Sequence, residues 1–291
     1  MDGSKRKIRY NEEMKFPFIS LNGRIIPSKE GLVSLDKTEI AYGFGVYETI
    51  KVRNNVIYFL PQHIERLLHS AKEINLSHVF TVSKMQIAIE ELVASTEIDS
   101  CNIKIFLYGA SEKEKATLCV IPTAPLYPDR KWYRDGVSLI SFQHERWKPQ
   151  AKTLNMLPSY CMFKEAQKQG CYDALLFDAQ HNLREGTRTN VYLIKDKHIY
   201  SPQKKDILEG VTLMTLEKAI QSTDYTLTYT DIPFRTIHEF DGMFLTSTST
   251  KIMPVKKIDN KEYPFISEHI KALINIYENK LEKSKGDFSK L

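Results

Sequence analysis

The sequence predicts a mixed α/β protein folded as two lobes. Segments that alternate apolar and polar residues, typical of strands, recur along the chain among segments with the three-to-four residue repeat of amphipathic helices. Near the middle, residues 122–128 hold three prolines in seven positions, which disfavours helix and sheet pairing and is typical of an extended connector. We therefore expect an N-terminal α/β domain over residues 1–120, a linker over 121–135 and a C-terminal α/β domain over 136–291.

Two hairpins are expected in the N-terminal half, each with asparagine at the turn. Asn22-Gly23 favours a two-residue hairpin turn because both positions take positive φ, and Asn54-Asn55 marks a second turn. The flanking strands are expected at 18–21 and 24–26 for the first hairpin, and at 46–52 and 56–59 for the second.

Two helices and two further strands complete this half. Pro61 begins a helix at a position where its missing N–H costs nothing, and Ser83 is the expected N-cap of the next helix. The expected apolar faces are Ile64, Leu67, Leu68, Ala71 and Ile74 for the first helix, and Met85, Ile87, Ile89, Leu92 and Val93 for the second. The strands are expected at 103–107 and 118–121.

The C-terminal half alternates strands with helices. Strands are expected at 137–142, 174–177, 190–194 and 227–229, and helices near 159–169 and 213–221. Gly170 stands where a left-handed residue ends the first of these helices.

Composition excludes several classes of protein. With 291 residues, 42% hydrophobic and 26% charged, the chain has enough apolar residues for two cores. The charged start lacks an apolar segment behind it, and no long uncharged run spans a membrane, so a cytoplasmic protein is expected. The four cysteines have no C-x-x-C spacing, which indicates reduced thiols and no metal site.

The net charge of +5 is modest and partly local to the last dozen residues. There the lysines alternate with acidic residues, and the segment lacks the repeated interleaving of aromatic residues with basic ones that is typical of nucleic-acid binding. We interpret the tail as a solvated helix end, and expect no nucleic acid partner. A mild positive field suits anionic small molecules better.

One amine and one carboxylate carry the chemical signal. Lys152 lies in Ala-Lys-Thr-Leu-Asn, and Glu185 follows it by 33 residues in Leu-Arg-Glu-Gly-Thr-Arg-Thr-Asn. A lysine can form an imine with the aldehyde of pyridoxal phosphate, and a carboxylate at the far side of the ring can keep the pyridine nitrogen protonated. The pair suggests a pyridoxal phosphate enzyme, although either residue alone is more often a surface charge.

The order of motifs around this pair resembles the class IV aminotransferase family, which includes branched-chain aminotransferases, D-amino acid aminotransferases and aminodeoxychorismate lyase. The resemblance runs from about residue 18 to about residue 254. Its motifs are Tyr-Gly-Phe-Gly-Val-Tyr-Glu-Thr-Ile at 42–50, His-Ile-Glu-Arg-Leu at 63–67, Lys152, the 185–190 segment, Leu-Glu-Gly-Val-Thr at 208–212 and the hydroxyl-rich 244–250.

This resemblance implies fold type IV, with an N-terminal α/β sandwich, a C-terminal pseudo-barrel and pyridoxal 5′-phosphate held between the two domains. It also implies a homodimer. Lys152 would bind the cofactor and then move the proton between the substrate and the cofactor. Glu185 would lie in a loop just before strand 190–194 and pair with the ring nitrogen.

The resemblance also implies how the phosphate and the substrate are held. The backbone N–H groups of Val211 and Thr212, at a helix N-terminus, would bind the phosphate. The hydroxyl of Thr248 and the guanidinium of Arg66 would add donors. Tyr47 matches the family's aromatic residue near the substrate, and Arg188 resembles an arginine that contacts the substrate carboxylate in a minority of D-amino acid transaminases.

Several positions depart from the family's substrate signatures. Phe44 stands where many members have aspartate, and Leu107-Tyr108-Gly109 lacks the arginine of well-studied D-amino acid enzymes. Lys104 and Leu157 replace the arginine and the tyrosine of branched-chain enzymes.

We therefore expect a pyridoxal phosphate-dependent aminotransferase that moves an amino group from a D-amino acid or a branched-chain amino acid to a 2-keto acid. The alternative is 4-amino-4-deoxychorismate lyase, which eliminates pyruvate at the same kind of site. A third interpretation is a non-catalytic dimeric binding module that retains the fold.

Overall fold

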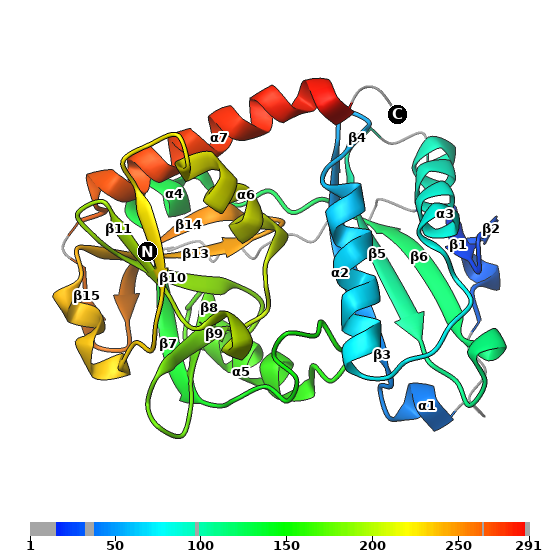
Figure 1. The fold of residues 1–291 in the computed structure, drawn as a ribbon, viewed down its shortest axis with the longest axis horizontal. Helices are drawn as coiled ribbons and strands as arrows, with labels where there is room; N and C mark the ends of the chain where they lie inside the picture. The colour runs from blue at the N-terminus through cyan, green and yellow to red at the C-terminus, as the bar shows by residue number, and fades with distance from the viewer. Residues whose placement is uncertain (1–15, 33–37, 97–98, 264, 289–291) are drawn as a thin grey trace, which may run out of the picture. The chain divides into compact units, whose positions relative to one another are not determined.

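The computed structural model describes residues 16–32, 38–96, 99–263 and 265–288 (Figure 1). The chain divides into two compact units. Unit 1 comprises Met1–Glu65 and Leu76–Leu126, and unit 2 comprises Arg66–Asn75 and Tyr127–Leu291. Each unit contains a β-sheet with helices packed against it, so the expected mixed α/β class is confirmed.

The elements of unit 1, with the helix α2 that continues into unit 2, come first along the chain. They are β1 (Phe18–Leu21), β2 (Arg24–Pro27), the 3-10 turn η1 (Ser28–Glu30), α1 (Thr38–Ala41), β3 (Gly45–Arg53), β4 (Val56–Ile57), α2 (Leu60–Glu73), α3 (Val82–Ser95), β5 (Cys101–Tyr108), η2 (Lys113–Lys115) and β6 (Thr117–Thr123).

The remaining elements belong to unit 2. They are α4 (Arg130–Asp135), β7 (Val137–Gln143), α5 (Leu157–Lys168), β8 (Asp173–Phe177), β9 (Leu183–Gly186), β10 (Asn190–Lys195), β11 (His198–Ser201), η3 (Lys204–Asp206), α6 (Val211–Ile220), β12 (Thr226–Tyr229), η4 (Phe234–Glu239), β13 (Gly242–Ser247), β14 (Lys251–Ile258), β15 (Lys261–Glu262) and α7 (Glu268–Phe288).

The sheet of unit 1 is antiparallel, with the order β2-β1-β6-β5-β3-β4 among the described strands. Both asparagine turns are confirmed, since Asn22 and Gly23 have φ of 53° and 84°, and Asn54 and Asn55 have φ of 52° and 61°. The return strand of the second hairpin is shorter than the expected 56–59. Strand β4 ends at Ile57, and Phe59 takes a φ of 58° that stops the strand directly before α2.

Helix α3 packs on β1, β2 and β6, and it starts earlier than expected. Its N-cap is Thr81, whose hydroxyl accepts a hydrogen bond from the Lys84 N–H at 3.3 Å, and Ser83 lies inside the first turn. The expected apolar face is confirmed except at Ile87, which is 49% exposed. The buried set Met85, Ala88, Ile89, Leu92 and Val93 follows the helical repeat, and position 87 falls on the opposite side.

The expected linker over 121–135 begins inside a strand. Residues 121–123 pair with β5 as the end of β6. The ladder between β1 and β6 stops at Val120, so the missing N–H of Pro122 breaks no bond on that side. Residues 130–135 of the same expected linker form α4, because the Asp129 carboxylate caps it by accepting from the Lys131 N–H at 3.0 Å.

The sheet of unit 2 is mixed and has the order β12-β11-β10-β13-β14-β7-β8-β9, with β15 paired to β14. Strand β7 is parallel to both β14 and β8, and β11 is parallel to β12. Apolar side chains of this sheet form one core cluster with residues of β7, β9, β10, β13 and β14. Strand β9, which carries Arg184 and Glu185, is therefore part of the packed interior.

The solvated helix end expected for the last dozen residues falls mostly on residues 283–291, whose side chains lie outside the described part of the chain. Before that point, one face of α7 is buried at Ile270, Leu273, Tyr277 and Leu281. These residues recur at helical spacing, and α7 packs along α6, β13 and β14 (Figure 1). Within the described ranges, none of the helices combines the length and the apolar character needed to cross a lipid bilayer.

A buried polar pair fixes α2 to β3 within unit 1. The Glu48 carboxylate lies 2.8 Å from Nδ1 of His63, and both side chains are fully buried. Breaking a buried pair of this kind leaves the surviving partner without its hydrogen-bond partner in the protein interior.

We expect Glu48→Ala to lower the free energy of unfolding by roughly 3–5 kcal/mol, measured by chemical denaturation followed by circular dichroism. Lys115→Ala, which removes the exposed pair with Glu112, is the control and should change little; equal effects of the two variants would contradict the assignment.

Candidate active site

Glu185 lies inside a strand, and the sequence-based expectation of a loop is wrong. Strand β9 pairs with β8, so residues 183–186 continue the sheet rather than leaving it. The Glu185 side chain is 5% exposed. A carboxylate this deep in the interior requires hydrogen-bond donors or a positive charge nearby.

Arg146 supplies that charge. Its Nε donates to Oε1 of Glu185 at 2.6 Å, and its Nη2 donates to the carbonyl of Pro149 at 2.5 Å. Oε2 of Glu185 accepts a longer bond from the Leu208 N–H at 3.4 Å. Arg146 belongs to no motif in the sequence, and nothing in its neighbourhood marks it, so sequence reasoning missed it.

Lys152 lies on the segment between β7 and α5, three residues beyond the carbonyl that Arg146 holds. Its side chain is half-buried, and its backbone N–H donates to the hydroxyl of Ser70 at 3.0 Å. Ser70 is on α2, one helical turn after Arg66, so both residues lie on the same face of that helix.

Arg66 holds the segment before α6. Its Nη1 donates to the carbonyl of Glu209 at 3.0 Å. Val211 and Thr212 form the first turn of α6, both are buried, and the N-cap Gly210 has no side chain to bond their N–H groups. A ten-residue helix that begins this way presents backbone donors and the positive end of its dipole to an anion.

These five hydrogen bonds, together with the short stretches of backbone between them, form a closed circuit within unit 2, called the hydrogen-bonded circuit below. It runs from the Lys152 segment to Ser70 and Arg66 on α2, on to Glu209 and Leu208, then to Glu185, and through Arg146 back to Pro149. The circuit joins the backbone of the predicted lysine to the predicted carboxylate and to the segment before the predicted phosphate-binding helix turn.

Gly210 is a place where only glycine fits. A Cβ at this position would collide with Oδ1 of Asn190, whose Nδ2 donates to the carbonyl of Leu208 at 2.7 Å. The buried Asn190 amide thus holds the turn that leads into α6. A buried carboxylate at one end and uncapped helix N–H groups with an arginine at the other suit a ligand that has a protonated ring nitrogen and a phosphate. The residues present fit pyridoxal 5′-phosphate.

The remaining predicted residues are placed as follows. Thr248 lies half-buried in the turn between β13 and β14, a turn closed by a 2.7 Å bond between the hydroxyls of Ser247 and Thr250. Tyr47 belongs to unit 1, where it is half-buried on β3 and stacks on Phe106 at a centroid distance of 6.5 Å.

Arg188 lies exposed at the tip of the loop between β9 and β10. Its guanidinium stacks 3.9 Å above the Phe163 ring and 5.4 Å from the Tyr172 ring. The hydroxyls of the flanking Thr187 and Thr189 both donate to the fully buried Asp173 carboxylate. Burial raises the pKa of Asp173, against the lowering effects of Arg188 and of these hydrogen bonds. Both sides of the loop tip are anchored, and Arg188 is directed outward.

Comparisons with known proteins identify the family. Residues 45–258, well over half of the chain, match the family model of amino-transferase class IV. The chain is 28% identical over 255 residues to a D-alanine aminotransferase of Bacillus licheniformis, covering 84% of this chain and 89% of that protein. It is 27% identical over 259 residues to a putative branched-chain-amino-acid aminotransferase of Methanocaldococcus jannaschii, covering 84% and 88%.

A solved structure shows the same fold. The branched-chain amino acid aminotransferase of Escherichia coli superposes with a TM-score of 0.84 at 18% identity, covering 91% of this chain and 94% of that one. The chain belongs to the class IV aminotransferase family. It is a pyridoxal phosphate-dependent aminotransferase of fold type IV, as the order of its motifs indicates.

Proposed function

We propose that this aminotransferase moves the amino group of a D-amino acid, or of a branched-chain amino acid, to a 2-keto acid at the hydrogen-bonded circuit of unit 2. The observation that carries the proposal is the circuit, which joins the Lys152 segment, the Glu185 carboxylate and the N-terminus of α6. The reaction proceeds in two half-reactions: the first amino acid leaves as its keto acid, and a second keto acid then receives the nitrogen.

Each residue has a distinct role in this proposal. The bound cofactor supplies an aldehyde and a ring that withdraws electrons from the substrate carbon. The Lys152 amine binds the cofactor and moves the proton. Glu185 accepts a hydrogen bond from the protonated ring nitrogen, and Arg146 fixes the direction of its carboxylate. The N–H groups of Val211 and Thr212, with Arg66 and Thr248, bind the phosphate.

Substrate binding is assigned to Arg188 and Tyr47. Arg188 follows Glu185 by three residues, and its guanidinium is exposed and oriented by two rings, an arrangement suited to a carboxylate. This assignment favours D-amino acids, in line with the D-alanine aminotransferase relatives. Branched-chain substrates are the second choice, in line with the archaeal relative.

The assembly is proposed as a cytoplasmic homodimer. Trp147, Leu157 and Tyr160, in and next to the lysine-bearing segment, are exposed in the single chain at 66%, 71% and 57%. Several large apolar side chains near one segment are typical of a surface that another subunit covers.

A substrate panel tests the function. Purified enzyme is supplied with individual D- and L-amino acids and 2-oxoglutarate, and the keto acid products are quantified. We expect transfer with at least one D-amino acid or branched-chain amino acid. No transfer with any of them, together with pyruvate release from 4-amino-4-deoxychorismate, would replace the aminotransferase proposal with the lyase alternative.

The role of Lys152 is tested by Lys152→Ala. We expect no turnover and no cofactor fixed to the protein by borohydride. The circular dichroism spectrum should be unchanged, because the change removes a half-buried side chain and keeps the backbone hydrogen bond to Ser70. Lys164→Ala, which removes an exposed lysine on the neighbouring α5, is the matched control. The assignment fails if Lys152→Ala still fixes the cofactor and turns over at the normal rate.

The role of Arg188 is tested by Arg188→Ala. Losing one partner of a desolvated bidentate pair costs roughly 2–5 kcal/mol. Arg188 is exposed in the single chain, so we expect a smaller cost, a decrease in kcat/KM of about tenfold or more for every amino acid. Arg188→Lys should recover part of this loss. Arg235→Ala, at another exposed arginine, is the control. A change within about twofold for Arg188→Ala would remove Arg188 from the substrate site.

A further inference from the structure

The geometry points to Arg184 as a positioning residue for the phosphate-binding end of the site, acting through Asp206. This inference rests on the proposed binding of the cofactor phosphate at the N-terminus of α6. Arg184 precedes Glu185 on β9, and successive side chains of a strand point to opposite faces. Arg184 is only 8% exposed, so its guanidinium requires acidic partners inside the protein.

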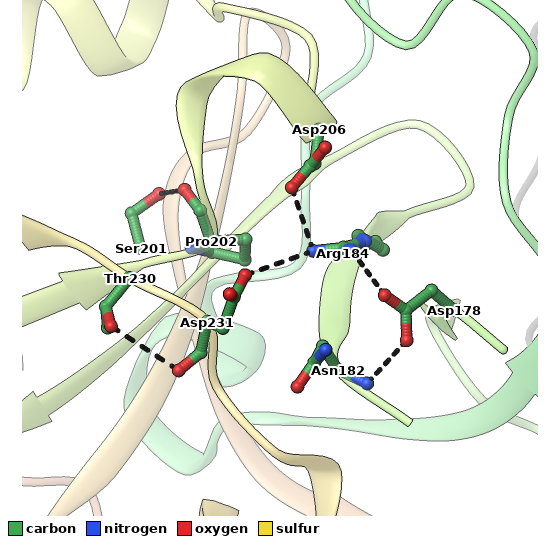
Figure 2. A network of polar contacts seen from close by, with 8 residues as sticks. All are labelled: Asp178, Asn182, Arg184, Ser201, Pro202, Asp206, Thr230 and Asp231. Atoms are coloured by element: carbon green, nitrogen blue, oxygen red, sulfur yellow. Dashed lines mark hydrogen bonds and ion pairs between the residues drawn. The ribbon is translucent and has the colours of Figure 1, made fainter. Parts of the chain in front are cut away.

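Three carboxylates surround this guanidinium (Figure 2). Nη2 of Arg184 bonds Oδ2 of Asp178, Nη1 lies 3.2 Å from Oδ2 of Asp206, and the same Nη1 lies 3.8 Å from Oδ1 of Asp231. The exposed fraction of the carboxylate side chain rises with its distance from the guanidinium: Asp178, Asp206 and Asp231 are 1%, 21% and 60% exposed. Solvent therefore screens the Asp231 contact most strongly.

The first and second partners serve different parts of the chain. Asp178 is local, since its other oxygen accepts from the Asn182 N–H at 2.7 Å and so closes the turn between β8 and β9. Asp206 ends the 3-10 turn η3, four residues before the N-cap of α6. The Arg184–Asp206 pair therefore reaches from β9 to the segment that leads into the phosphate-binding turn.

That segment, residues 202–210, joins β11 to α6 and contains no regular structure other than η3. Its course depends on side-chain contacts. Glu185 and Asn190 hold Leu208, Arg66 holds Glu209, and Arg184 holds Asp206. Arg184 and Glu185, which are adjacent on β9, thus contact Asp206 and Leu208, which are two residues apart in the segment.

The consequence concerns the distance between the two ends of the cofactor site. Glu185 fixes the ring end from β9, and Arg184 ties the approach to the phosphate end to the same strand. If Asp206 is released, Gly210 and the first N–H groups of α6 lose one of their fixed points. Donors that must be ordered upon binding give weaker affinity than donors held in place beforehand. Removing the pair should therefore weaken phosphate binding and leave the chemistry at Lys152 unchanged.

Asp206→Asn tests this inference with Asp231→Asn as the matched control, because both changes neutralise a carboxylate next to the same Nη1. Changing Arg184 itself would leave three carboxylates without their counter-charge and endanger folding. Affinity is measured by titrating the cofactor-free protein with pyridoxal 5′-phosphate and, separately, with pyridoxal, which lacks the phosphate.

We expect Asp206→Asn to raise the dissociation constant for pyridoxal 5′-phosphate roughly tenfold, which is a usual size for coupling between two sites. The affinity for pyridoxal, and kcat at saturating cofactor, should stay within about twofold of the parent values. Amide hydrogen exchange at residues 208–212 of the cofactor-free protein should become faster. Asp231→Asn should change none of these quantities by more than about twofold.

Two results overturn the inference. One is a lower melting temperature for Asp206→Asn with unchanged affinity for pyridoxal 5′-phosphate, which would make the network purely a stabilising one. The other is an equal loss of affinity for pyridoxal and pyridoxal 5′-phosphate. Arg66→Ala separates this inference from the proposed function: if it weakens pyridoxal 5′-phosphate binding while Asp206→Asn does not, only the inference falls, and if neither does, both fall.

Discussion

The buried carboxylate of Glu185 is the constraint on which the site depends. A carboxylate with 5% exposure must be compensated inside the protein, and its partners come from two segments distant in sequence: Arg146, between β7 and α5, and the Leu208 N–H, before α6. Because Arg146 also holds Pro149 near Lys152, the partners of this one carboxylate bring the segment that carries Lys152 and the segment before α6 to the same strand.

Strand β9 performs this role with two charged residues in succession. Arg184 and Glu185 are both buried, carry opposite charges and find their partners on opposite faces of the strand. Each residue also contacts the segment between β11 and α6. In the proposed cofactor site, this arrangement would hold the ring end and the phosphate end to the same strand, which suits a ligand of fixed length.

The loop between β9 and β10, residues 187–189, directs the Arg188 side chain outward while the backbone on both sides of it belongs to the sheet. The buried Asp173 carboxylate accepts hydrogen bonds from the hydroxyls of Thr187 and Thr189. A Cβ at position 186 would collide with Oγ1 of Thr189, so residue 186 must be glycine for the loop to adopt this conformation. The alternation of threonine and arginine at 187–189 is thus a structural device: the threonines face inward and the arginine faces the solvent and the Phe163 ring.

Features that depend only on neighbouring residues could be predicted from the sequence. Asparagine and glycine at 22–23 and 54–55 adopt positive φ in the turns, Gly170 ends α5 with a φ of 72°, and the ordered motifs indicated the family because their spacing is a property of the chain. Features that depend on distant partners emerged only in the folded chain. Arg146 and Arg184 carry no local signal, since a charged side chain becomes part of a site only when burial forces it to find a counter-charge. Glu185 is a strand residue because β8 pairs with its strand. The apolar spacing in α7 indicates that one face of the helix is buried, but only the folded chain shows that α6, β13 and β14 cover it.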